Sequence, residues 1–487
     1  MITIIEKSKA FAGNTAIVDV QGAYSYEQLR MTAQRIAANI VAMQPAAKPI
    51  FFLIPSGFSY VAVQWGIWLA GNIAVPIHIA HPISEISYLL EDTGSELLIY
   101  EESLADKAKA IAGARIIPLG ELLQPAQQEA VLPVVTPDDD AMMIYTSGTT
   151  GRPKGVVMTH AQLDAQMRSL TEAWGWSEQD RILNVLPMHH VHGVINITCC
   201  ALYNGAVLEM QSGFDPAQVC ARMGSRELTI FMAVPTIYHK LVQYFEELPA
   251  EAQKQWQRGM AGMRLMVSGS AALPVTVLER WKKISGHTLL ERYGMTEIGM
   301  ALSNPLDGLR KPGYVGMPLP LVQVKIVDEQ GVVITANKEP GELHVQGATV
   351  FKRYWKRPEE TAQSFADGWF KTGDIAERDD EGYYRILGRN SSDIIKSGGY
   401  KISALEIENA MLEHEGIVEC AVVALPSEEW GETIAAAFTG NADPESLGPW
   451  LKNHLAPYKI PRQFICVAEL PRNAMGKLIK NQVKEMF

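Results

Sequence analysis

Short apolar runs rich in branched residues recur along most of this chain, and stretches of helical periodicity separate them. Residues 48–57 have the composition of a buried strand ending in a turn. Residues 59–77 have that of a helix, a Gly-Asn turn and a second strand. Further strand-like runs occupy 96–100, 114–119, 180–187, 206–210, 228–235 and 263–270, with helical segments at 161–174 and 275–285. This alternation is typical of layered α/β structure with buried, largely parallel strands.

The pattern changes after about residue 310. From there to residue 388, glycine, proline and alternating apolar residues indicate a small β-rich unit. A compact α+β piece follows. Ser403 and Glu406 have the spacing of a capping box, which predicts the start of its first helix. A chain of 487 residues exceeds one ordinary core, and the polar stretch 388–393 is the best boundary. We therefore predict a large α/β N-terminal domain at 1–388, with its β-rich subdomain at about 310–388, and a small α+β C-terminal domain at 389–487.

Composition restricts the class of protein and its partners. Apolar residues make up 47% of the chain and charged residues 20%, which fits a globular fold rather than disorder. The formal charge of −11 argues against broad binding to nucleic acid or anionic membranes. The five cysteines form no CxxC pair, so we expect small core residues in a reducing compartment rather than disulfides or a zinc site. Neither a signal or transit peptide nor a membrane span is evident, and we expect a cytoplasmic protein.

A polar segment between two apolar runs is the strongest functional signal. Small hydroxyl or glycine residues run without interruption from 146 to 150. Such a segment exposes many N–H groups and hydroxyls to one concave space, where a lysine adds a point charge for polyphosphate. An ordinary polar turn is the alternative, but a strand at 156–158 and a helix cap at Thr159 would attach the segment to a sheet edge. The predicted nucleotide-binding residues here are Thr146, Ser147, Gly148, Thr149, Thr150, Gly151, Arg152, Pro153 and Lys154.

Five further motifs follow in a fixed order: residues 293–297, 371–374, 388–389, 398–401 and 473–477. With the polar segment, they make the whole chain resemble the adenylate-forming superfamily of acyl-CoA synthetases, peptide-synthetase adenylation domains and luciferases. The resemblance implies an ATP-dependent acid–CoA ligase that forms an acyl-adenylate and then an acyl-CoA, releasing pyrophosphate and AMP. It also implies Mg²⁺ and coenzyme A, and a C-terminal domain that moves between the two half-reactions.

Each motif contains residues suited to nucleotide chemistry. Glu297 can hold Mg²⁺ against the phosphates, since Mg²⁺ prefers a few carboxylates plus phosphate oxygens. Tyr293 offers a flat face for adenine, although buried aromatic residues are more often simply core. Asp374 can accept both ribose hydroxyls, although an aspartate after Thr-Gly is often only a turn residue. The resemblance favours the binding roles, places Arg389 at the same sugar, and adds Thr296, Gly294, Ser270 and Ala271 to the nucleotide site.

The resemblance also gives roles to the C-terminal region. Lys477 would enter the active site and stabilise the charge that develops as pyrophosphate leaves, whereas Lys480 and Lys484 are expected to be solvated surface lysines. Gly398 and Gly399 would line the passage for the slim pantetheine arm of CoA. One departure lies at the hinge, where three residues rather than the usual two separate Arg389 from the next aspartate.

The acid substrate is predicted from the segments at 186–193, 231–238, 268–274 and 290–301, which most resemble malonyl- and methylmalonyl-CoA synthetases. Arg292 stands at the floor of the expected acid pocket, where its planar fork could bind the second carboxylate of a dicarboxylic acid. Its alternative role is a salt bridge to Glu291 or Glu279. His190 and His192 are candidates for the same pocket or for the thiol channel, although isolated histidines are more often core groups.

Other functions remain open on the sequence alone. A medium- or long-chain fatty acid–CoA ligase could use the same site, and Arg292 argues against it. The thiol could belong to a carrier protein, although we expect no attached carrier domain. An ATP-binding sensor without chemistry would have no need of Lys477. We expect a small carboxylic acid, ATP and CoA as partners, no nucleic acid, no integral membrane association, and a monomer or homodimer.

Overall fold

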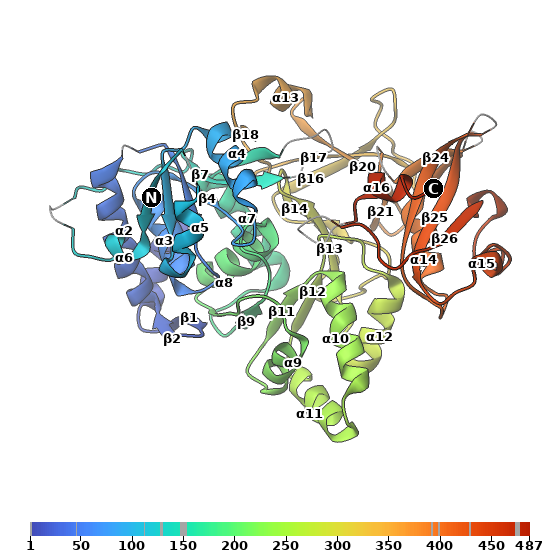
Figure 1. Cartoon of the computed structure of the whole chain (residues 1–487), viewed down its shortest axis with the longest axis horizontal. Helices are drawn as coiled ribbons and strands as arrows, with labels where there is room; N and C mark the ends of the chain where they lie inside the picture. The colour runs from blue at the N-terminus through green and yellow to red at the C-terminus, as the bar shows by residue number, and fades with distance from the viewer. Residues whose placement is uncertain are drawn as a thin grey trace.

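The fold is described from a computed structural model that covers residues 2–44, 46–111, 113–126, 130–146, 153–390, 393–397, 400–427, 430–472 and 478–487. Two large sheets form the N-terminal half, a third sheet follows, and a fourth belongs to the C-terminal unit. Figure 1 shows the C-terminal unit, in red, at the opposite end of the molecule from the first residues.

The first large sheet carries most of the candidate site. Its strand order is β15-β14-β13-β12-β11-β9-β10-β1-β2, and the run from β13 to β1 is parallel. Because parallel strands end at the same edge, the loops after β9, β12 and β13 lie together. Its strands are β1 (Thr15–Asp19), β2 (Gly22–Ser25), β9 (Arg181–Asn184), β10 (Val207–Met210), β11 (Ile230–Ala233), β12 (Leu265–Ser268), β13 (Leu290–Met295), β14 (Gly299–Ser303) and β15 (Met317–Pro318).

The second large sheet has the order β18-β8-β7-β4-β3-β5-β6 and ends in the hairpin that bears the polar segment. Its central strands are buried along their whole length, as their continuous apolar composition predicts. Its strands are β3 (Pro49–Leu53), β4 (Ile73–Pro76), β5 (Leu97–Tyr100), β6 (Arg115–Pro118), β7 (Asp140–Thr146), β8 (Lys154–Thr159) and β18 (Arg353–Tyr354). The predicted strands at 48–57, 96–100 and 114–119 are confirmed.

The β-rich part is an antiparallel sheet in which β17 and β20 are central. Its strands are β16 (Val322–Val327), β17 (Gly341–Gly347), β19 (Phe365–Ala366), β20 (Trp369–Arg378) and β21 (Tyr384–Arg389). The pairing of β20 with β21 places Asp374 opposite Arg389. Two motifs that are separate in the sequence thus become neighbours.

The C-terminal unit has its own apolar core around Ile395, Ile407 and Phe438. Its strands are β22 (Ile394–Ser397), β23 (Tyr400–Ser403), β24 (Ile417–Ser427), β25 (Gly431–Gly440) and β26 (Gln463–Cys466). Ser403 caps the following helix by accepting from the Glu406 N–H, as predicted. The Glu406 carboxylate, however, pairs with Lys459 at 2.6 Å instead of returning to the cap, so the capping box is only half formed.

The helices cover the sheets in layers, as Figure 1 shows. The Thr159 cap predicted from sequence is a complete capping box with Gln162. Within the described residues, no helix has the length and apolar character needed to cross a membrane. The helices are α1 (Thr3–Lys7), η1 (Ser8–Phe11), α2 (Tyr26–Met43), α3 (Phe58–Leu69), α4 (Ile83–Thr93), η2 (Glu102–Leu104), α5 (Ala105–Lys109), α6 (Leu119–Leu122), α7 (His160–Trp174), η3 (His192–Cys199), α8 (Cys200–Tyr203), α9 (Pro216–Gly224), α10 (Pro235–Glu247), α11 (Ala250–Met260), α12 (Val275–Ser285), α13 (Pro358–Gln363), α14 (Ala404–Met411), α15 (Pro444–Leu451), η4 (Pro457–Lys459) and α16 (Lys480–Lys484).

Two predictions about single residues are wrong. Cys466 is exposed, because it ends β26, whereas the other four cysteines are buried core residues as predicted. Lys480 is not a solvated surface lysine: its ammonium group lies 2.6 Å from Asp393 and 2.8 Å from Glu408, and its side chain is largely buried. A lysine enters a protein interior at low cost only when carboxylates accompany it, and no local sequence pattern reveals such distant partners.

Candidate active site

A buried polar cluster lies where β9, β12 and β13 end. Arg292 comes from β13, Ser270 from the loop after β12, and His192 from the first turn of η3, a π-helix. Arg292 Nη2 lies 3.3 Å from Ser270 Oγ, which lies 3.2 Å from His192 Nδ1. Three residues from distant parts of the sequence therefore form one connected group, two of which were predicted to contact the acid.

Backbone geometry makes room for this cluster. A Cβ atom on Gly269 would lie 2.6 Å from Arg292 Cζ, so a side chain there would displace the guanidinium. Ser270 has a φ of 71°, a left-handed conformation that costs energy for a residue other than glycine. Both features bring the loop after β12 close to Arg292.

The electrostatics of the cluster are those of a buried cation. Arg292 is 3% exposed, and burial lowers its pKa to about 10, which still leaves it charged at neutral pH. Burial, together with the charges of Arg292 and His190, holds the pKa of His192 well below its usual range, so this imidazole is neutral. Among the described residues no carboxylate pairs with Arg292, and its Nε atom has no hydrogen-bond partner.

The alternative for Arg292, a salt bridge to Glu291 or Glu279, is not formed. Successive side chains of a strand point to opposite faces, so Glu291 points away from Arg292. The Glu291 carboxylate is buried, accepts a hydrogen bond from the Leu273 N–H at 3.1 Å, and has its pKa raised to about 8 by burial. Glu279 is exposed on α12.

A second group brings together the residues predicted for the nucleoside. The Tyr293 hydroxyl donates to Asp374 Oδ2, and Arg389 Nε lies 3.0 Å from Asp374 Oδ1. Asp374 itself is 6% exposed. Tyr293 directly follows Arg292 on β13.

Glu297 lies in the tight turn between β13 and β14, beside Thr296. Its buried carboxylate accepts a hydrogen bond from the Tyr354 hydroxyl at 3.0 Å, and burial raises its pKa. Gly294, near the end of β13, has no room for a side chain, since a Cβ there would lie 2.1 Å from the Gly299 carbonyl oxygen. A lone carboxylate beside a hydroxyl suits Mg²⁺, which takes few protein ligands and completes its shell with phosphate and water oxygens.

The polar segment is attached to the sheet at both ends. Thr146 of β7 pairs with Lys154 of β8, and Tyr88 donates to the Pro153 carbonyl oxygen at 3.0 Å. Tyr145 donates to Asp92 at 2.7 Å, and Lys154 forms an ion pair with Glu360. Six of the predicted nucleotide-binding residues, Ser147, Gly148, Thr149, Thr150, Gly151 and Arg152, lie outside the described residues, as do Gly398, Gly399 and Lys477.

The structure also places residues that sequence reasoning missed. The ring of His190 packs 3.9 Å from that of His189, which contacts the rings of His78 and His81 from the loop after β4. Ser270 contacts Arg292 and His192, whereas Ala271, predicted beside it for ATP, is exposed. The His-His pair at 189–190 is visible in the sequence, but its partners lie over a hundred positions away and gave no signal.

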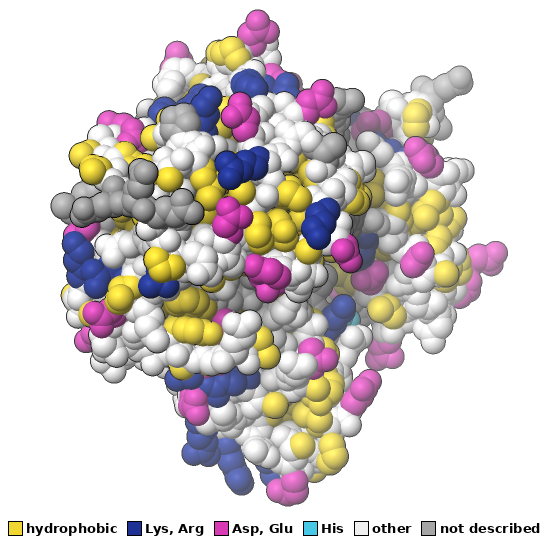
Figure 2. Space-filling view, turned by 60° about the vertical axis from the view of Figure 1, so that its left-hand side comes forward, with side chains coloured by type: hydrophobic (Ala, Val, Ile, Leu, Met, Phe, Trp, Pro, Cys, Tyr) yellow, Lys and Arg dark blue, Asp and Glu magenta, His cyan; other side chains and the backbone are white. Residues whose placement is uncertain are grey.

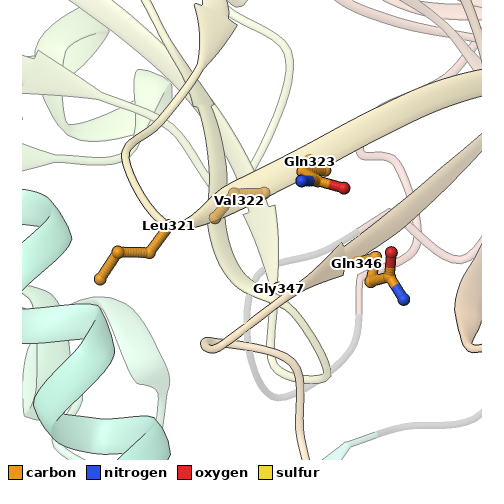
Figure 3. Close-up of a pocket in the computed structure, with 5 residues that line it drawn as sticks. All are labelled: Leu321, Val322, Gln323, Gln346 and Gly347. Carbon is orange, nitrogen blue, oxygen red and sulfur yellow. The ribbon is translucent and has the colours of Figure 1, made fainter.

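One hollow on the surface is unrelated to this chemistry. Leu321, Val322, Gln323, Gln346 and Gly347 line a cavity of about 340 Å³. Figure 3 shows Gln323 and Gln346 on neighbouring strands. The lining contains no ionisable side chain.

Comparison with known proteins shows the family of this chain. The model of the AMP-binding enzyme family matches residues 5–355, and that of the AMP-binding enzyme C-terminal domain matches residues 406–477. The chain belongs to the AMP-binding enzyme family. This membership confirms the predicted AMP-forming acyl-CoA synthetase class.

Relatives and solved structures extend the match to the whole chain. The chain is 43% identical to the mitochondrial malonate–CoA ligase of Xenopus laevis, over 100% of this chain and 92% of the relative. It is 40% identical to the malonate–CoA ligase of Arabidopsis thaliana, over 88% and 76%. Its fold matches ATP-bound MatB from Rhodopseudomonas palustris with a TM-score of 0.91 and 31% identity, over 100% and 99% of the two chains.

A further structural relative bears on the cofactors. The O-succinylbenzoate coenzyme A synthetase of Bacillus subtilis, in complex with ATP and magnesium ion, matches with a TM-score of 0.88 and 28% identity, over 99% of each chain. The predicted requirement for ATP, Mg²⁺ and CoA, the mixed α/β fold with a small C-terminal domain, and the resemblance to malonyl-CoA synthetases are confirmed.

Proposed function

We propose that this protein is an ATP-dependent malonate–CoA ligase, and that Arg292 binds the distal carboxylate of the acid. The observation that carries the proposal is a buried guanidinium for which the described residues supply no carboxylate. Burying a charge is costly unless an opposite charge accompanies it, and a dicarboxylic acid brings one. The names of the relatives from Xenopus laevis and Arabidopsis thaliana point to the same acid.

Neighbouring groups support this assignment. Ser270 Oγ and neutral His192 lie beside the guanidinium and can complete the hydrogen bonds of a bound carboxylate. A fatty acyl chain in the same place would press methylene groups against an unpaired cation, which disfavours the medium- or long-chain alternative. The methyl group of methylmalonate adds no charge, so this acid is a second candidate.

The first half-reaction needs positioning and charge stabilisation rather than a protein nucleophile. The proximal carboxylate attacks the α-phosphorus of ATP, and pyrophosphate leaves. We assign the ribose to Asp374 and Arg389, the adenine to Tyr293, and the phosphates to the polar segment with Lys154. Glu297 would hold Mg²⁺, which supplies neutralisation of phosphate charge, and Lys477 would stabilise the leaving pyrophosphate together with Thr296.

The second half-reaction transfers the acyl group to a thiol. We propose coenzyme A as the thiol, with Gly398 and Gly399 at its passage. We place the domain boundary at residues 388–389 and propose rotation about the following stretch. The separate apolar core of the C-terminal unit, which begins at Ile395, supports that boundary.

Partners and location are proposed on the same basis. We propose that the partners are small molecules: a carboxylic acid, ATP and CoA. We also propose that the protein is a monomer or homodimer and that it is located in the cytoplasm. Figure 2 shows basic and acidic side chains interspersed over one face, which gives nucleic acid no broad cationic surface there. The relative from Xenopus laevis is named as mitochondrial, so cell fractionation is the measurement that decides the compartment.

An AMP-release assay tests the function. Malonate, methylmalonate, acetate, butyrate and palmitate are compared with and without CoA. We expect malonate to give the highest kcat/KM and CoA to be needed for sustained AMP release. Preference for palmitate would establish the fatty-acid ligase instead, and ATP binding without AMP release would establish a sensor.

A further inference from the structure

Lys480 is a buried lysine close to the end of the chain. Its side chain is 13% exposed, and its Nζ atom lies 2.6 Å from Asp393 Oδ1 and 2.8 Å from Glu408 Oε1. The two carboxylates are themselves only 14% and 12% exposed. Such an arrangement holds three chain segments together, because removing one member leaves the other charges buried without compensation.

The carboxylates belong to different parts of the C-terminal half. Glu408 lies on α14 and also accepts a hydrogen bond from the Val422 N–H at 2.8 Å, so it is part of the small domain. Asp393 lies at the junction between the domains. Its Oδ2 atom accepts from the Arg389 N–H at 3.0 Å, and its carbonyl oxygen accepts from the Ala404 N–H at 2.7 Å.

The junction also contacts the nucleotide group directly. Arg389, whose N–H bonds to Asp393, pairs through its side chain with Asp374. Gly388 has a φ of 132°, and a Cβ there would lie 2.4 Å from that of Asp393, so Asp393 packs closely on the end of β21. A continuous set of contacts therefore runs from Asp374 through the junction to Lys480.

The segment that contains Lys480 is attached to the small domain elsewhere. The Ile479 N–H donates to the Pro471 carbonyl oxygen at 2.9 Å, Arg472 pairs with Glu419 at 2.7 Å, and Val483 is fully buried. These contacts hold the segment to β24 and its neighbours. Lys480 adds a direct ionic link from the segment to the junction.

We propose that Lys480 is a positioning residue for the first half-reaction, because its ion pairs with Asp393 and Glu408 orient the C-terminal segment against the domain junction. The inference rests on the proposed function, in which Lys477, three residues earlier in the sequence, acts on the departing pyrophosphate. Lys480 touches no reacting atom in this scheme. It fixes the end of the segment from which Lys477 is presented.

The test separates positioning from folding and from the choice of acid. Lys480→Met removes the charge, Lys484→Met makes the same change on the same helix, and Lys480→Arg keeps a cation for the two carboxylates. The double variant Lys480→Met with Glu408→Gln removes one of the two carboxylates that Lys480→Met leaves unpaired, which restores the net charge of the wild-type group and limits the effect on the fold. For each full-length protein we would measure the thermal midpoint, amide exchange in residues 478–487, acyl-adenylate formation, and thioester formation from supplied acyl-adenylate.

We expect Lys480→Met, alone and in the double variant, to speed amide exchange in 478–487 by more than about tenfold. Acyl-adenylate formation should fall by up to about a hundredfold in kcat, the effect expected of a small misplacement, with KM for ATP nearly unchanged. Thioester formation should be retained, Lys480→Arg should recover most of the first step, and Lys484→Met should resemble the wild type.

If the stable double variant loses both half-reactions to the same extent, Lys480 has only a structural role. If amide exchange in residues 478–487 is unchanged, Lys480 does not link the segment to the junction. Amide exchange requires no acid, so it tests the link even if wild-type enzyme rejects malonate. That rejection would contradict the proposed substrate and not the link. Half-reactions are then measured with the acid that the wild type prefers.

Discussion

Arg292 illustrates how one side chain can restrict the choice of substrate. It is buried and charged, and among the described residues its Nη2 atom contacts a serine hydroxyl rather than a carboxylate. The cost of keeping this cation in the interior is offset only when an anion binds. On the proposed function, the residue that binds the second carboxylate of a dicarboxylic acid would therefore penalise an acid with an apolar tail.

Replacing Arg292 with alanine should lower the ratio of kcat/KM for malonate to that for butyrate. Truncating one partner of a buried charge pair costs ~2–5 kcal/mol, and butyrate has no second charge to suffer this loss. The ratio measured in both proteins checks the prediction, with Ser270→Ala as a milder change in the same cluster. An unchanged ratio would show that Arg292 has a structural role.

Replacing Asp374 with alanine should weaken the use of ATP. Hydrogen bonds to charged groups contribute ~1.5–3 kcal/mol, so a ten- to hundredfold loss in kcat/KM for ATP is about the size expected. Because Asp374 also pairs with Arg389, Asp374→Asn is the companion variant that keeps the side-chain shape. Wild-type ATP kinetics in the alanine variant would exclude the ribose role.

At the scale of elements, the two faces of β13 place their side chains in different environments. Arg292 points to the polar cluster, and Glu291 points into the packing beneath, where burial raises its pKa to about 8. The strand continues into the tight turn that positions Glu297. β13 and the turn that follows it thus carry the residues proposed for the acid, the nucleoside and Mg²⁺.

The raised pKa of Glu291 makes a prediction about stability. The unfolded chain releases this proton near pH 4.5, whereas the folded protein keeps it until about pH 8. The stability contributed by the protonated carboxyl is therefore complete below pH 4.5 and declines through this window, by about 1.4 kcal/mol per pH unit. Glu291→Gln, which stays neutral and can still accept from Leu273, should be less sensitive to pH.

Thermal unfolding of wild type and Glu291→Gln from pH 5 to 8 measures this effect. The variant should gain in midpoint relative to the wild type as the pH rises. Parallel curves would show that Glu291 is ionised throughout this range in the folded protein.

At the scale of the whole molecule, the apolar clusters of the large domain and those of the C-terminal unit are separate, and Arg389 and Asp393 lie between them in the sequence. Arg389, which we propose binds the nucleotide, therefore belongs to the same short region as the proposed pivot. A rotation about this region would change what the C-terminal domain presents to the nucleotide while leaving the acid cluster of the large domain intact.

Lys477→Ala should abolish acyl-adenylate formation and leave thioester formation from supplied acyl-adenylate largely intact. The reason is that, on the proposed function, the two steps use different domain orientations and this lysine acts in only one of them. Rapid-quench measurement of each half-reaction checks the prediction. Loss of both steps to the same extent would contradict the role assigned to Lys477.

The sequence by itself determined the elements and the kind of chemistry. Strand and helix positions follow from apolar periodicity, and the cap at Thr159 follows from residues three apart, because both are local properties of the chain. Gly294 and the acidic and aromatic residues around it were visible as one motif. These features sufficed for the family and for the candidate nucleotide site.

Only the tertiary structure decided which charges meet. Ser270 and His192 are 78 positions apart in the sequence, and Tyr293 and Asp374 are 81 positions apart. Their contacts depend on the order of strands in two sheets. Lys480 was predicted to be a solvated surface lysine, but it is buried between Asp393 and Glu408. The prediction is wrong for the same reason, because the sequence around a lysine does not reveal its distant partners. The local sequence pattern predicts whether a position is buried within its own element. The partner of a buried charge depends on how the elements pack against one another.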